Sequence, residues 1–321
     1  MLKLESDVIG IDALSEASKK LEGEIAKVIV GQKEVVRSII ISIFANGHSL
    51  LVGVPGLGKT LLVNTISQAL GLEFNRIQFT PDLMPSDIVG AEILGEDRTF
   101  KFVKGPVFTN VLLADEINRT PPKTQAALLE AMQEKKVTNA GKSLPLPSPF
   151  FVLATQNPID QEGTYPLPEA QLDRFMFNIW VDYPTLEEEV EVVKSTTSDY
   201  KNQVNPVLTV EEIIAFQELI RRIPVADNVL EYAVKLANKT RKDSELAPNN
   251  TKEYLTWGAG PRASQYLVLG AKTHAALNGK YSPDIEDVQA VAMPILRHRI
   301  MRNYKAEADG ISLEEIIKSL L

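Results

Sequence analysis

Short apolar runs alternate with helical patterns through the middle of this chain. Five of the runs are typical of buried strands, because they are short and bounded by polar residues. They cover residues 49–52, 75–79, 111–114, 150–154 and 175–181. Helical patterns lie between several of them, notably at 61–70 and 123–133. The alternation predicts an α/β fold, a parallel five-stranded sheet with covering helices, in which ligands bind beyond the carboxyl ends of the strands.

Helical patterns also flank the predicted sheet. Apolar residues recur at helical spacing over 1–29 and 35–44. Beyond Pro184 we expect helices only, at 210–222, 225–242, 262–278, 285–300 and 313–321. Glu187, Glu188 and Glu189 suit the positive N-terminal end of a helix that Thr185 begins. We therefore predict two domains, an α/β domain over 1–184 and an all-α domain over 185–321.

Two stretches interrupt the alternation of strands and helices. Residues 91–103 and 137–146 each hold two extended segments around a turn that contains glycine. We interpret both as β-hairpins. From the pattern alone they are either surface decorations or functional inserts.

One glycine-rich segment directly follows the first predicted strand. Gly53-Val-Pro-Gly-Leu-Gly-Lys59-Thr60 matches the phosphate-binding pattern G-x-x-x-x-G-K-[ST], between a strand and a helix. Its glycines let successive backbone N–H groups converge on an anion at the positive end of the helix. Lys59 can reach the β- and γ-phosphates of a nucleotide, and the Thr60 hydroxyl can bind Mg²⁺. The segment predicts a nucleoside triphosphate site.

Candidate catalytic groups follow two other predicted strands. Asp115 and Glu116 end the third one, where Asp115 is suited to support Mg²⁺ and Glu116 to orient or deprotonate the attacking water. Adjacent acids also occur in ordinary turns, but a phosphate loop upstream favours the catalytic interpretation. Asn157 follows the fourth strand and fits two interpretations, a hydrogen bond to the γ-phosphate or a simple Asn-Pro turn.

Two arginines are candidates for stabilising charge on a transferred phosphoryl group. Arg174 precedes the fifth predicted strand, and Arg262 begins a helix after Gly258-Ala-Gly-Pro261. From the residues alone, membership of a surface ion pair explains each arginine more simply.

Composition narrows the classes of function. The chain has no Cys, which excludes disulfides, thiolate metal sites and thiol catalysis, and its three His residues lack metal-ligand spacing. The formal net charge of −8 disfavours a nucleic-acid partner, because such proteins usually carry a basic surface. No apolar run approaches the roughly 20 residues that span a bilayer, and the N-terminus is no signal peptide. We expect no membrane insertion and a cytoplasmic location.

Together these motifs resemble those of AAA+ ATPases, specifically the MoxR group, over nearly the whole chain. The resemblance includes Gly31-Gln32, the phosphate loop, Ala127-Leu-Leu-Glu-Ala-Met-Gln133, Ala154-Thr-Gln-Asn-Pro158, Leu167-Pro-Glu-Ala-Gln-Leu-Asp-Arg-Phe175 and Gly260-Pro-Arg262. The segment Ile117-Asn-Arg-Thr-Pro-Pro-Lys-Thr-Gln125, after the acid pair, points to MoxR proteins in particular. Magnesium-chelatase ATPase subunits and the minichromosome-maintenance helicases look like more distant relatives.

The resemblance implies ATP and Mg²⁺ as cofactors and a role for each motif residue. Lys59 and Thr60 match the first Walker motif, and Asp115 and Glu116 match the second. Asn157 matches sensor 1. The implied nucleotide-binding residues are Gly31, Gln32, Gly53, Val54, Pro55, Gly56, Leu57, Gly58, Lys59, Thr60, Leu61 and Arg262. Thr60 and Asp115 are the implied metal residues, and Lys59, Glu116, Asn157, Arg174 and Arg262 the implied catalytic ones.

The resemblance also implies an assembly. Arg262 matches sensor 2, acting from a helical lid, and Arg174 matches the arginine finger that reaches the nucleotide of a neighbouring subunit. A complete site then exists only in a head-to-tail ring, expected to be a hexamer. The two hairpins resemble the helix-2 insert and the pre-sensor-1 hairpin, which in relatives face the ring axis or the client.

Three functions are consistent with these features. The first is an ATP-driven chaperone that remodels a protein partner, by resemblance one that works with a von Willebrand factor A domain protein. The second is a nucleic-acid translocase, which the hairpin residues Lys101, Lys104 and Lys142 support weakly. The third is a scaffold gated by ATP binding alone.

Overall fold

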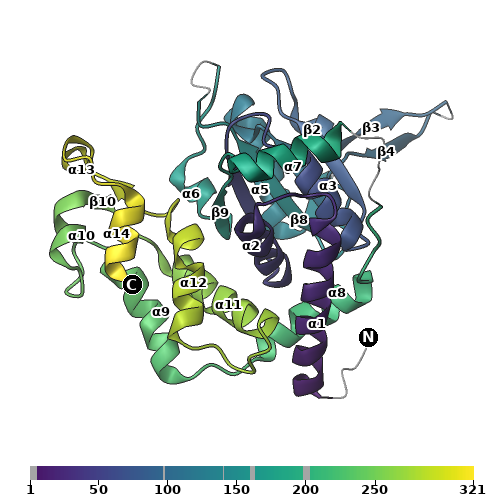
Figure 1. Ribbon diagram of the computed structural model, residues 1–321. Helices are drawn as coiled ribbons and strands as arrows, with labels where there is room; N and C mark the ends of the chain where they lie inside the picture. Colours follow the sequence, from purple (N-terminus) through teal and green to yellow (C-terminus); the bar gives the residue numbers. More distant parts are fainter. Residues whose placement is uncertain (1–5, 97, 140, 160–162, 198–202) are drawn as a thin grey trace.

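A five-stranded parallel sheet lies at the centre of the computed structural model, which describes residues 6–96, 98–139, 141–159, 163–197 and 203–321 (Figure 1). The strand order is β2-β5-β8-β1-β9, and every neighbouring pair runs parallel. The strands are β1 (Ser49–Val52), β2 (Phe74–Gln78), β5 (Val111–Asp115), β8 (Phe151–Gln156) and β9 (Phe177–Trp180). The predicted α/β fold and its five strands are confirmed.

Helices cover both faces of this sheet. Successive strand side chains point to opposite faces, so Leu51 joins one apolar cluster while Leu50 and Val52 join the other. The first cluster packs against α1 (Asp7–Ala26), α2 (Lys33–Phe44) and α3 (Lys59–Ala69), and the second against α4 (Pro85–Val89) and α5 (Pro122–Glu134). A short 3₁₀ helix, η1 (Ile117–Arg119), follows β5.

The predicted first helix is present as α1, which ends at Ala26, three residues before the predicted end at Ile29. It begins at Asp7 because the Ser6 hydroxyl accepts a hydrogen bond from the Ile9 N–H at 3.2 Å, which caps its first turn. Residues 1–5, which we expected to be helical, lie outside the described ranges.

Both predicted hairpins are present as antiparallel pairs. The first joins β3 (Gly90–Leu94) to β4 (Phe100–Lys104), and the second joins β6 (Lys136–Asn139) to β7 (Lys142–Pro145). The β3–β4 hairpin projects from the body of the molecule (Figure 1). Within the described ranges its two strands form a separate two-stranded sheet.

Beyond Pro184 the described chain is helical, as predicted, with one addition. Its helices are α7 (Leu186–Thr196), α8 (Val210–Arg222), α9 (Asp227–Lys239), α10 (Asn249–Tyr254), α11 (Pro261–Leu277), α12 (Ile285–Leu296), α13 (Tyr304–Ala308) and α14 (Leu313–Leu320), and the short helix α6 (Glu169–Leu172) lies before β9. The addition is an antiparallel pair, β10 (Leu255–Trp257) with β11 (Met301–Arg302). Strands of three and two residues are too short to show a periodicity, and we had predicted helix as far as residue 300.

The acidic start of α7 serves to cap that helix, as predicted. Thr185 and Glu188 form a reciprocal capping box. The Thr185 N–H donates to the Glu188 carboxylate at 2.9 Å, and the Glu188 N–H donates to the Thr185 hydroxyl at 3.3 Å.

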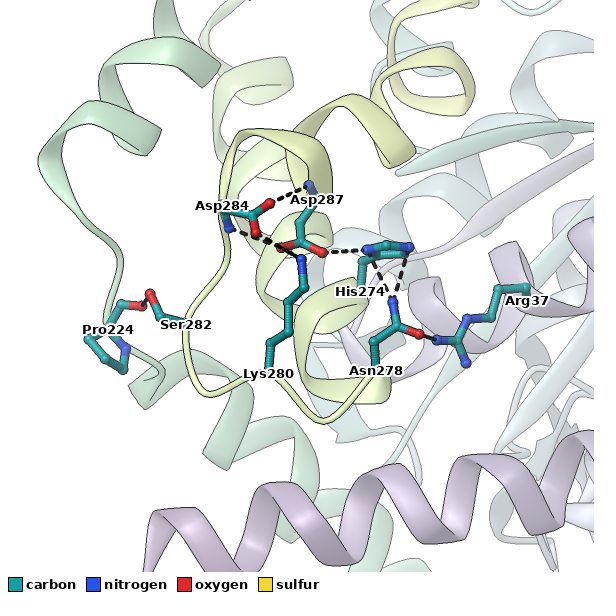
Figure 2. A network of polar contacts seen from close by, with 8 residues as sticks. All are labelled: Arg37, Pro224, His274, Asn278, Lys280, Ser282, Asp284 and Asp287. Carbon is teal, nitrogen blue, oxygen red and sulfur yellow. Dashed lines mark hydrogen bonds and ion pairs between the residues drawn. The ribbon is translucent and has the colours of Figure 1, made fainter.

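The helical half is joined to the sheet half by apolar packing and by a polar network. The apolar cluster under α1–α3 continues into α8, α9, α11 and α12. In the network, Arg37 of α2 donates to the Asn278 side chain at 2.7 Å, beside the His274–Asp287 pair of α11 and α12 (Figure 2). The domain division after residue 184 stays a prediction, because the cluster crosses it. No helix within the described ranges is both long and apolar enough to cross a bilayer.

The three histidines pack within the fold. His274 pairs with the buried Asp287 carboxylate at 2.7 Å, and His298 contacts the Phe175 carbonyl at 3.0 Å. His48 is buried between the Val152 N–H, at 3.0 Å, and the Met132 carbonyl, at 3.3 Å. Burial lowers the pKa of His48 from 6.5 to about 4, so the folded protein holds it neutral.

We expect His48 to make the fold sensitive to acid. Its pKa is depressed only in the folded state, so its contribution is complete above pH 6.5 and is lost as the pH falls toward about 4. The loss amounts to about 3 kcal/mol of unfolding free energy. Urea titrations across this range should show a shallower decline for His48→Gln, which keeps a donor and an acceptor. Parallel declines in the two proteins would contradict the assignment.

Candidate nucleotide site

A cavity of about 380 Å³ opens where β1, β5 and β8 end. The order of the sheet places β8 between β1 and β5, so the segments that follow these three strands meet at one edge. The residues that line the cavity are Pro55, Gly56, Gly58, Lys59, Thr60, Arg76, Asp115, Glu116 and Asn157. Eight of these nine residues, all except Arg76, were predicted from the sequence.

The predicted phosphate loop has the backbone that its sequence requires. Gly56 and Gly58 have φ values of +88° and +71°, a region that residues with a Cβ adopt rarely, and no atom would meet a Cβ at either position within 4 Å. A Cβ at Gly53 would meet the Val181 carbonyl oxygen at 2.6 Å. Helix α3 begins directly after Gly58, at Lys59. Its first N–H groups therefore face the cavity, as an anion site requires.

The Lys59 ammonium lies inside this loop. It donates hydrogen bonds to the carbonyl oxygens of Gly53 and Val54. Burial lowers the pKa of Lys59, while the charges of Asp115 and Glu116 act in the opposite direction. The side chain is thus a partly buried amine, held at the cavity where a phosphate would enter.

Thr155 of β8 links the two acids. Its buried hydroxyl donates to Asp115 Oδ1 at 2.6 Å and accepts a hydrogen bond from the Glu116 N–H at 2.8 Å. Glu116 adopts φ +57°, a left-handed conformation, between β5 and the short helix η1. One hydroxyl therefore fixes the turn that aims both acids.

The neighbouring edge strand contacts the same acids. Arg76 of β2 donates twice to Asp115 Oδ2, from Nε at 3.0 Å and from Nη2 at 2.6 Å, and Nη2 also reaches Gln78 Oε1 at 2.7 Å. The Gln78 amide donates to Glu116 Oε2 at 2.9 Å, and Arg119 reaches the same oxygen at 3.1 Å. Both carboxylates are therefore hydrogen-bonded by side chains that project from β2.

Four other predicted residues lie at or beside the cavity: Gly31, Gln32, Leu61 and Asn157. Gln32 donates to the Leu57 carbonyl at 3.4 Å, which places Gly31–Gln32 beside the phosphate loop. A Cβ at Gly31 would meet the Glu188 carboxylate at 2.5 Å, so α7 lies against this segment. Leu61 is exposed on the first turn of α3. Asn157 accepts a hydrogen bond from the Ile159 N–H at 3.1 Å, as in a turn, and still lines the cavity.

The two predicted arginines lie where the strands begin, at the opposite end of the sheet from the nucleotide cavity. Arg174 precedes Phe177, the first residue of β9, which pairs with Ser49 at the beginning of β1. The phosphate loop leaves the other end of β1, about 13 Å away along four strand residues. Arg262 and Arg174 line a common cavity of about 170 Å³, and neither lines the nucleotide cavity.

An ion-pair cluster built around the buried Arg299 lies beside these arginines. Asp173 binds Arg262 at 3.0 Å and Arg299 at 2.8 Å. Arg299 is almost completely buried and also donates to the carbonyl oxygens of Asp173, Phe175 and Met176. The end of α12 and the start of α11 are thereby fastened to the turn that carries Arg174.

Comparison with known proteins places this architecture in a family. The model of the ATPase family associated with various cellular activities (AAA) matches residues 48–177, and the AAA lid model matches 248–320. The chain is 44% identical to Chaperone MoxR1 of Mycobacterium tuberculosis, over 93% of this chain and 79% of that one. The chain belongs to the MoxR-type AAA+ ATPases.

Two further comparisons agree with this MoxR-type assignment. Protein MoxR of Methylorubrum extorquens is 30% identical over 89% of this chain and 88% of its own. A crystal structure from Cytophaga hutchinsonii superposes with a TM-score of 0.90 at 43% identity, over 97% of this chain and 95% of that one. The match to the AAA model ends at residue 177, and the match to the lid model begins at residue 248.

The residues at the cavity fit Mg²⁺ bound together with a nucleotide. Mg²⁺ prefers oxygen ligands and usually takes one or two from protein, the rest coming from phosphates and water. Thr60 and Asp115 supply a hydroxyl and a carboxylate on one cavity wall. No cluster of three or more His, Cys, Asp or Glu that could hold a metal ion occurs in the described ranges.

Three residues at the site were not singled out from the sequence. Arg76 and Gln78 lie in a strand that we had recognised only by its apolar residues. Thr155 stands within the Ala154-Thr-Gln-Asn-Pro158 motif, where only Asn157 had been assigned. A polar residue in an otherwise apolar buried strand was the available signal for Thr155.

We expect the Thr155 hydroxyl to stabilise the fold as well as to aim the acids. Thr155→Val keeps the shape but leaves the partly buried Glu116 N–H without its acceptor, which should cost about 1–3 kcal/mol of unfolding free energy. Thr155→Ser keeps the hydroxyl and serves as the matched control. Chemical denaturation of both variants tests this, and equal stability of the Val and Ser proteins would refute it.

Proposed function

We propose that this chain hydrolyses ATP with Mg²⁺ as a subunit of a ring, and uses the cycle to remodel a protein client. The family resemblance suggests that the ring is a hexamer. The proposal rests on where the candidate catalytic residues lie. The phosphate loop and both acids lie at one edge of the sheet, and both arginines lie at the other.

The proposed chemistry assigns one task to each group. Lys59 and the loop N–H groups bind the β- and γ-phosphates, and Thr60 and Asp115 hold Mg²⁺, which supplies charge neutralisation when bound. Glu116 accepts the proton of the attacking water, and Asn157 orients that water or the γ-phosphate. Gly31 and Gln32 form a wall beside the base.

The proposed ring follows from the place of the arginines. Strand β1 separates them from the phosphate loop of their own chain, whereas a head-to-tail neighbour can bring them to it. We assign Arg174 as the finger and Arg262 as a second cation beside it, both serving the neighbouring subunit's nucleotide. The sequence had suggested Arg262 as a lid residue, and its pairing with Asp173 supports action in concert with Arg174.

A protein client fits the exposed surface of the projecting hairpin. Ile93, Leu94, Phe100 and Val103 of β3–β4 are each at least half exposed. Apolar groups gathered on a projecting element favour contact with protein. Lys104 packs over the Phe108 ring at 5.2 Å, so it is not a purely solvent-facing cation for a phosphate backbone. A von Willebrand factor A domain protein is the partner that the family resemblance suggests.

Replacing the proposed base separates hydrolysis from binding. Glu116→Gln should still bind ATP but lose at least about 100-fold in the hydrolysis rate, because the amide cannot accept the proton. Glu187→Gln, at the start of α7, removes an acid outside the site and should behave as wild type. ATP titration by calorimetry and phosphate release measure the two properties. Undiminished hydrolysis would refute the assignment, and retained client activity without hydrolysis would support the scaffold alternative.

Mixing two inactive proteins tests the shared site. Lys59→Ala lacks the phosphate cation and Arg174→Ala lacks the finger, so neither alone should hydrolyse ATP. In a mixed ring, one interface orientation combines the intact Lys59 of one subunit with the intact Arg174 of the next. Random equimolar assembly should restore up to about a quarter of the wild-type rate. Mixed rings that never exceed their parents would show that Arg174 does not act on a neighbour.

A further inference from the structure

Arg76 binds the carboxylate that the proposed metal needs. Asp115 Oδ1 is occupied by the buried Thr155 hydroxyl, which also fixes the Glu116 N–H. The other oxygen, Oδ2, accepts two hydrogen bonds from Arg76. A cation that approaches Asp115 from the cavity therefore meets an oxygen that is already hydrogen-bonded to the Arg76 guanidinium.

The position of Arg76 allows it to leave. Its side chain is 45% exposed, whereas that of Asp115 is 11% exposed. Arg76 projects from β2, the edge strand of the sheet, and lines the nucleotide cavity with Lys59. Rotation of an exposed arginine costs little compared with displacing the buried Thr155 hydroxyl.

We propose that Arg76 is a resident counter-cation of Asp115 that Mg²⁺ must displace, so that Arg76 sets how strongly metal and nucleotide binding reinforce each other. The inference rests on the proposed nucleotide site. A guanidinium and a divalent cation at one carboxylate repel each other, so the metal binds more weakly while Arg76 remains. Once displaced, Arg76 still faces the cavity, where the phosphates are anionic.

The second contact of Arg76 extends this effect to the proposed base. Its Nη2 holds Gln78 Oε1 at 2.7 Å, which turns the Gln78 amide toward Glu116 Oε2 at 2.9 Å. Displacement of Arg76 from Asp115 therefore also removes an anchor from the amide that binds Glu116. Arg76 therefore links metal binding at Asp115 to the hydrogen bonding of Glu116, the proposed base.

The test measures the metal dependence of nucleotide binding rather than turnover. A fluorescent, non-hydrolysable ATP analogue is titrated into full-length protein with excess MgCl₂ and again with EDTA. The dissociation constant in EDTA divided by the dissociation constant in MgCl₂ measures the coupling between metal and nucleotide. In Arg76→Gln this ratio should rise by about two- to fivefold, the scale of a partly exposed ion pair. Arg76→Lys keeps the charge and should retain most of the wild-type ratio.

Arg119→Gln is the matched control. Arg119 has nearly the same exposure, 44%, but pairs with Glu116, so the ratio should change by less than about twofold. An unchanged or lower ratio in Arg76→Gln would overturn the inference. So would a rise of the same size in Arg76→Lys or in Arg119→Gln, because displacement of a charge from Asp115 would not explain it. Absence of nucleotide binding in the wild type would instead overturn the proposed function on which the inference rests.

Discussion

The parallel register of the central sheet is the constraint on which the site depends. Because all five strands run the same way, everything that follows a strand gathers at one edge, and everything that precedes a strand gathers at the other. The order places β8 between β1 and β5, so the Thr155 hydroxyl can reach Asp115 while Asn157 faces the phosphate loop. One slip of register would turn Thr155 and its neighbours to the opposite face.

Charge is distributed at this edge so that buried acids always have partners. An isolated carboxylate at the depth of Asp115 would be costly, and Thr155 and Arg76 offset that cost without a ligand. Lys59 is held by loop carbonyls in the same way. The arrangement explains how a site built for a highly charged ligand is compatible with a stable fold.

The sequence allowed us to predict residues that belong to contiguous motifs. It did not reveal residues whose side chains contact a neighbouring strand. The phosphate loop and the acid pair are contiguous in the chain, so the pattern fixed their chemistry and their edge of the sheet. Arg76 lies 39 residues from the aspartate that it binds, and only the pairing of β2 with β5 brings them together. The β10–β11 pair was missed for a different reason, since it depends on two very short segments meeting in space.

The buried Arg299 explains why the two arginines at the other edge form one unit with the lid helices. Its side chain, 1% exposed, binds the Asp173 carboxylate and three backbone carbonyls around the turn that precedes β9. Arg262 reaches the same carboxylate from the start of α11. A rotation of α11 and α12 that left Arg174 behind would expose or unpair these charges, at a cost of several kcal/mol. In the proposed ring, the lid and the finger of one subunit would therefore move together against the neighbouring phosphate loop, so that closure over the nucleotide and delivery of the finger are one motion.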